Sequence, residues 1–89
     1  LEEQIQIIDS IISKVCEIAE VSIEELRSNK KTNILVAARV YIVRLAVKKK
    51  VVIRLIQDRI NRKRGVVLHY LYEYKETFDY EMLKYKLEK

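Results

Sequence analysis

A chain of 89 residues supports one hydrophobic core and excludes two independently folded domains. Hydrophobic residues make up 49% of the sequence, which excludes a disordered segment although 35% of the residues are charged and the net charge is +5. The longest apolar run, 34–47, is interrupted by Arg39 and Arg44 and is shorter than the ~20 residues that span a bilayer. Because proline is absent and Gly65 is the only glycine, we expect an all-α fold, a small bundle of five to six helices over residues 1–89.

The first third of the chain predicts two helices and the start of a third. Isoleucine and valine recur at helical spacing over about 2–20, with mostly acidic residues between them. Ser22 and Glu25 then form a capping-box pattern, which predicts a short helix at about 23–28. The polar segment that follows offers Thr32 or the neighbouring asparagine as the start of the next helix.

The middle of the chain predicts a central helix and a shorter one. Residues 33–48 are apolar nearly all round, so this helix should be the one against which the others pack. A run of three lysines separates it from a helix at about 51–60. The apolar face of that shorter helix is predicted to hold Val52, Leu55, Ile56 and Ile60. Asn61 suits a left-handed turn after it, which makes a tight connection to the next helix.

The last third predicts two more helices. The fifth has an apolar face of Val67, Leu71 and Tyr74, and with the fourth it forms a predicted helix-turn-helix at about 51–76. Thr77 or the aspartate two residues later can cap a final helix that folds back on the bundle or projects from it. The apolar face of this final helix is predicted to carry Phe78, Met82, Tyr85 and Leu87.

The charges are strongly segregated along the chain. Residues 1–26 carry a net charge of −6, residues 27–67 carry +12, and residues 68–89 carry −1. A positive potential concentrated in one part of a small domain favours a polyanionic partner, because it steers and holds phosphate chains. The alternative interpretation is a lysine-rich solvated surface that keeps the protein soluble.

Nothing in the sequence indicates catalysis, a metal or a cofactor, and we expect none. Cys16 and His69 are the only residues of their types, so no Cys/His cluster exists for zinc. A lone Gly65 does not make a phosphate-binding loop. Because the single cysteine excludes an internal disulfide and no stretch resembles a signal peptide, we expect a cytoplasmic protein; a chain that begins at Leu1 also fits a trimmed piece.

Two segments carry a resemblance to a known family. The segment 21–45 reads VSIEELRSNKKTNILVAARVYIVRL, and the segment 56–69 reads IQDRINRKRGVVLH. In type and spacing they resemble the two signatures of the C-terminal DNA-binding domain of the bacterial replication initiator DnaA. The coinciding residues are Ser22, Glu24, Leu26, Ser28, Lys30, Ala38, Arg39, Leu45, Ile56, Arg62, Val67, Leu68 and His69. The resemblance covers about residues 10–75 and implies a Trp-repressor-like helix-turn-helix in the major groove, a basic loop at the minor groove, and a role in initiating DNA replication.

The sequence departs from the family where bases are read. The family has Asp-His-Thr-Thr at the places that here hold Lys63, Arg64, Gly65 and Val66, so its base-reading set is replaced. Lysine and arginine only donate hydrogen bonds, so they are suited to binding phosphates. Arg64 is also able to donate two hydrogen bonds to a guanine edge. Val66 retains only an apolar contact to a thymine methyl group. By the resemblance, Lys31 takes the place of the family's minor-groove arginine.

We therefore expect double-stranded DNA as the partner. The predicted contact residues are Lys30, Lys31, Lys48, Lys49, Lys50, Arg54, Arg62, Lys63, Arg64, Val66 and His69. Arg39 and Arg44 lie on the central helix and are expected to neutralise acids of the first helix. Because Arg39 also coincides with the family signature, a structural role is the alternative for Arg39. The alternative is a protein-interaction module with the same fold, docking through the acidic first helix or the tyrosine-rich tail. Attachment to an anionic membrane is a weaker alternative, because the basic residues occupy turns rather than one helical face.

Overall fold

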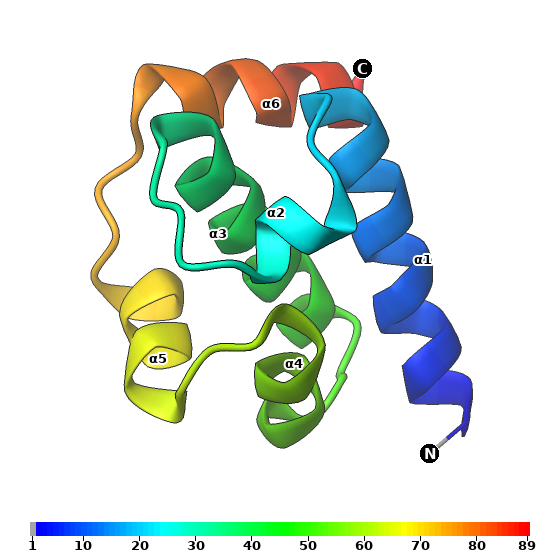
Figure 1. The fold of residues 1–89 in the computed structure, drawn as a ribbon. Coiled ribbons are helices and arrows are strands. Elements are labelled where there is room, and N and C mark those ends of the chain that lie inside the picture. The colour runs from blue at the N-terminus through cyan, green and yellow to red at the C-terminus, as the bar shows by residue number, and fades with distance from the viewer. Residues whose placement is uncertain (1) are drawn as a thin grey trace.

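A computed structural model describes residues 2–89, which form an all-α bundle without a β-strand (Figure 1). Its six helices are α1 (Glu2–Ala19), α2 (Ile23–Arg27), α3 (Asn33–Lys48), α4 (Ile53–Ile60), α5 (Arg64–Tyr72) and α6 (Phe78–Glu88). The prediction of a small helical bundle is confirmed, and the observed bounds lie within two residues of those predicted for the first four helices. No helix in this part of the chain has the length and apolar character that crossing a bilayer requires.

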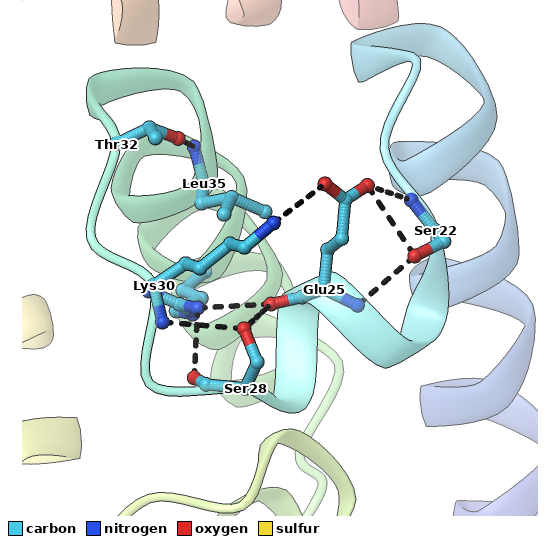
Figure 2. Close-up of polar contacts among 7 residues, drawn as sticks. Ser22, Glu25, Ser28, Lys30, Thr32 and Leu35 are labelled. Carbon is cyan, nitrogen blue, oxygen red and sulfur yellow. Dashed lines mark hydrogen bonds and ion pairs between the residues drawn. The ribbon is translucent and has the colours of Figure 1, made fainter.

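The helix ends form where the capping residues predict them. The Ser22 hydroxyl accepts from the Glu25 N–H at 3.0 Å, and the Glu25 carboxylate accepts from the Ser22 N–H at 3.1 Å (Figure 2). Thr32 caps α3 and Thr77 caps α6, each through its hydroxyl oxygen. Asn61 closes α4 in the left-handed conformation with φ of 56°, as its side-chain type predicts.

Helix α3 is the central element. Its buried residues cover most of its circumference, and α1, α2, α4, α5 and α6 all pack against it. In Figure 1 α1 runs along one flank, α6 crosses one end of the bundle, and α4 and α5 lie at the other end. The α4–α5 turn and α6 are therefore at opposite ends of the molecule.

The connection between α3 and α4 differs from the prediction. Lys50 adopts a left-handed φ of 68°, and the Val51 N–H donates to the Ala46 carbonyl at 3.0 Å. This turn buries Val51 and leaves Val52 at the N-cap of α4, 49% exposed. The predicted apolar face was therefore wrong at Val52, because Val51 fills the core from the turn.

The predicted apolar face of α6 was wrong at three of its four residues. Phe78, Met82 and Tyr85 are 77%, 42% and 62% exposed. The helix does fold back on the bundle, but it packs through Tyr80 and Leu83, with Leu87 half-buried. Tyr80 is held inward by aromatic contact with Tyr41 of α3, whose ring centroid lies 6.2 Å away.

Candidate nucleic-acid interface

The loop between α2 and α3 is tied to the turn between α4 and α5. The Asn61 Nδ2 donates to the Arg27 carbonyl at 3.0 Å, and the Arg62 Nη2 donates to the Ser28 carbonyl at 2.6 Å. Arg27 in turn donates through its Nη2 to the Asp58 carbonyl at 3.3 Å. Since each of these contacts joins residues more than thirty positions apart, they fix the two connections as one unit.

Arg39 holds the same loop from beneath. Its side chain is fully buried, and its Nε donates to the Leu26 carbonyl at 2.8 Å. Its Nη2 donates to the carbonyls of Glu25 and Ser28, at 3.2 and 3.1 Å. Arg39 therefore caps the end of α2. Of the two roles expected for Arg39, the structural one is confirmed; neutralisation of acids in the first helix was wrong, because the hydrogen bonds go to backbone carbonyls.

Burial lowers the pKa of Arg39 below its usual value, and the nearby charge of Arg62 lowers it further. The guanidinium still carries its charge at neutral pH, because arginine does not deprotonate in proteins. Within residues 2–89 its Nη1 is buried without a hydrogen-bond partner. Two cations thus lie close together beneath the loop.

Arg44 was also expected to meet acids of the first helix, and it does not. Its guanidinium donates to the carbonyls of Tyr70 and Tyr74, and pairs with Glu76 at 3.0 Å. It also lies over the Tyr80 ring, 5.3 Å from the centroid. Arg44 therefore holds the α5–α6 connection and is structural.

Figure 2 shows how the loop itself is shaped. The Ser28 hydroxyl donates to the Glu25 carbonyl at 2.7 Å and accepts from the Lys30 N–H at 3.2 Å. The Lys30 ammonium lies 3.8 Å from the Glu25 carboxylate, and both side chains remain largely exposed. Lys30, a predicted DNA contact, therefore has an acidic neighbour, whereas no ion pair is found for Lys31 in the described part of the chain.

An open hollow of about 480 Å³ lies where the loop, the turn and α5 meet. It is lined by Asn29, Lys31, Val36, Asn61, Arg62, Lys63, Val66, His69 and Tyr70. Three of the lining side chains are cationic and none is acidic. The structure thus brings together five of the predicted contact residues: Lys31, Arg62, Lys63, Val66 and His69.

The first turn of α5 is exposed and uncapped beside this hollow. Lys63 is the N-cap residue with no side-chain capping hydrogen bond, and the first turn contains no acid. Arg64 and Val66 are exposed there. A methyl group at Gly65 would have no other atom within 4 Å, and the φ angle of Gly65 is not positive. The fold itself therefore gives no reason for a glycine at this position.

The remaining predicted contacts lie outside the hollow. Arg54 is exposed on α4. His69, which does line the hollow, has its Nδ1 atom 3.6 Å from the Glu73 carboxylate. Lys49 lines a different hollow with Glu3 and other residues of α1. Lys48 is the last residue of α3, and the α3–α4 connection, which holds Lys49 and Lys50, lies in Figure 1 on the side of α4 that faces α1. The lysine run is thus on a different surface from Lys31 and Lys63.

The structural role of Arg62 was not predicted from the sequence. Arg62 was predicted as a DNA contact, and the structure gives its guanidinium two carbonyl partners, those of Ser28 and Asn61. No pattern within a single helix could have shown this role.

In the described part of the chain no group of three His, Cys, Asp or Glu side chains is placed to bind a metal. Comparison of the chain with protein-family models, with curated proteins and with solved structures gave no match. A functional interpretation therefore rests on the residues of this surface.

Proposed function

We propose that this protein binds double-stranded DNA, with α4 and α5 acting as a helix-turn-helix. The first turn of α5, Arg64 to Val66, enters the major groove, and Lys63 binds the adjacent phosphates. Lys31 extends from the α2–α3 loop toward the neighbouring backbone or minor groove. In this proposal the protein is similar in kind to the DNA-binding domain of DnaA, and a part in replication initiation rests on that resemblance alone.

The observation that carries the proposal is the acid-free cationic hollow beside the bare first turn of α5. Lys31 and Lys63 line it from two connections far apart in the sequence, which hydrogen bonds hold together. A lysine-rich surface that only keeps the protein soluble does not require two lysines from distant segments to be held side by side. A phosphate backbone passing over the hollow would meet both ammonium groups at once.

The helix dipole supports the same conclusion. Lys63 and Arg64 lie at the start of α5, where positive side chains are destabilising by a few tenths to about 1 kcal/mol each. An anion at the helix start reverses the sign of this effect, because it pairs with the side chains and with the free N–H groups together. The sequence of α5 is thus better suited to a bound than to a free state.

Binding led by the DNA backbone fits these residues better than strict sequence reading. Lys63 and Arg64 have no acceptor for a base, Gly65 has no side chain, and Val66 offers only a methyl contact. Arg64 is the residue best suited to a guanine edge. We therefore expect weak sequence preference, which selection of bound duplexes from a random pool would measure.

A titration against salt tests the proposal. With roughly five phosphate contacts, the logarithm of the affinity should fall with the logarithm of salt concentration with a slope of about −4 to −5. Fluorescence anisotropy of a labelled duplex gives this slope. No binding at low salt, or a slope near zero, would overturn the proposal.

A second candidate is a protein-interaction module that has lost DNA binding. The exposed apolar face of α6 favours it, because Phe78 and Tyr85 are unusually exposed for large hydrophobic residues. The variant Lys63→Glu/Arg64→Glu separates the two candidates. Duplex binding collapses in this variant under the DNA proposal, whereas under the alternative neither the parent nor the variant binds duplex DNA.

A further inference from the structure

Helix α6 has two apolar faces, and the bundle uses only one. Tyr80 and Leu83 are buried against the rest of the molecule. Phe78, Met82 and Tyr85 recur at spacings of four and three residues, which places them together on the opposite side of the helix. All three are exposed. A helix with an apolar stripe facing solvent is typical of an interaction surface.

Beside this outer face, two acidic residues and two basic residues lie in opposite halves of the helix. Asp79 and Glu81 lie in the first half, and Lys84 and Lys86 lie in the second half. The second half also holds Glu88, whose carboxylate accepts a hydrogen bond from the Tyr41 hydroxyl at 3.0 Å. Within residues 2–89 none of the four forms an ion pair. When the helix is reversed end to end about the midpoint between positions 82 and 83, Asp79 takes the place of Lys86 and Glu81 takes the place of Lys84.

We propose that the outer face of α6 binds the same face of a second copy of this chain, with the two α6 helices antiparallel about a two-fold axis. A two-fold interface requires a surface that is complementary to itself. In the antiparallel arrangement Met82 lies next to the axis, and Phe78 of one copy packs near Tyr85 of the other. Each acidic half then faces a basic half, whereas a parallel arrangement would set acid against acid and base against base.

The interface is small. An 11-residue helix is only about 16 Å long, so its face offers less area than stable dimers use. We therefore expect a weak dimer that forms and dissociates with concentration. Because α6 lies at the end of the bundle opposite the α4–α5 turn (Figure 1), the dimer leaves both cationic hollows exposed. This inference does not depend on the proposed DNA binding.

Sedimentation velocity of the full chain over a wide range of concentration tests the dimer. The parent chain should shift from monomer to dimer as concentration rises. Replacing Phe78 or Met82 by serine should weaken the dimer about tenfold or more, because each loses buried apolar contact. A parent chain that stays monomeric at every concentration would overturn the proposal.

Two charge variants test the antiparallel pairing itself. The basic variant Asp79→Lys/Glu81→Lys and the acidic variant Lys84→Glu/Lys86→Glu should each be monomeric, because like charges face each other. An equal mixture of the two should form the dimer again, since every pair across the axis is then opposite in sign. Glu17→Lys/Glu24→Lys is the matched control, since it changes the same charge on α1 and α2 and should dimerise like the parent.

Circular dichroism checks that each variant remains folded. Restored association in the mixture supports the proposed pairing even if one variant is less stable. A mixture that remains monomeric while both variants are folded contradicts it, as does a control that loses the dimer to the same extent.

Discussion

Arg39 and Arg62 donate to the same carbonyl oxygen, that of Ser28, at 3.1 and 2.6 Å. One guanidinium comes from the central helix and the other from the α4–α5 turn. Their shared acceptor fixes the height of the α2–α3 loop above α3 and its distance from α5. The position of Lys31 relative to Lys63 therefore depends on two arginines that lie beneath the surface.

Replacing Arg39 by methionine should destabilise the fold by about 2–4 kcal/mol, because it leaves the carbonyls at the end of α2 without buried donors. Urea unfolding followed by circular dichroism measures the change. Arg54→Met is the matched control and should stay within about 0.5 kcal/mol, because Arg54 is exposed. A loss below about 1 kcal/mol for Arg39→Met would contradict the structural role.

Arg62 and Lys63 should differ in how they affect the salt dependence of DNA binding. Lys63→Gln removes a phosphate contact, so the slope of log affinity against log salt should become less steep by about 0.9. Arg62→Gln should lower the affinity with little change in slope, because the Arg62 guanidinium is occupied by the carbonyls of Ser28 and Asn61. Equal changes in slope would show that Arg62 contacts phosphate directly.

Gly65→Ala should stabilise the free protein by about 0.5–1 kcal/mol, since the added methyl group meets no atom and alanine favours helix. The same change should weaken duplex binding several-fold if the DNA backbone passes close to the start of α5. Thermal unfolding and anisotropy titration give the two quantities. Ser13→Ala on α1 is the control that should leave binding unchanged, and unchanged binding in Gly65→Ala would refute the close approach.

The capping box should make stability depend on pH in the acid range. The hydrogen bond from the Ser22 backbone N–H lowers the pKa of the Glu25 carboxyl below its usual value of 4.5. A carboxyl with a lower pKa in the folded chain stabilises the fold above the unfolded pKa, and this contribution disappears as pH falls through the folded pKa. The parent should therefore lose more stability between neutral pH and pH below 4.5 than Glu25→Gln does. Parallel pH profiles from urea unfolding would contradict this.

The sequence was most informative where a local rule decides the structure. The hydroxyls of Ser22 and Thr32 accept from neighbouring backbone N–H groups, and Asn61 adopts the left-handed conformation that ends α4, so these positions predict where helices begin and end. The apolar character of 33–48 on all sides likewise predicts a central helix.

The sequence was least informative where a helix has two apolar faces and where residues far apart in the chain make contact. Both faces of α6 are apolar, and packing of Tyr80 against Tyr41, Tyr74 and Arg44 places Tyr80 rather than Phe78 in the core. The ties from Asn61 and Arg62 to the α2–α3 loop join residues more than thirty positions apart, so no periodicity reveals them. The lysine run was grouped with the predicted DNA contacts by charge alone, and the structure places Lys49 of this run beside α1.

The most direct measurement compares two charge reversals of equal size. Lys31→Glu/Lys63→Glu changes the cationic hollow, and Lys48→Glu/Lys49→Glu changes the lysine run beside α1 by the same net charge. Titration of one duplex at one salt concentration should give a loss of at least about a hundredfold for the first pair and only a few-fold loss for the second. Equal losses would mean that overall charge, and not the surface built by the α2–α3 loop and α5, holds the DNA.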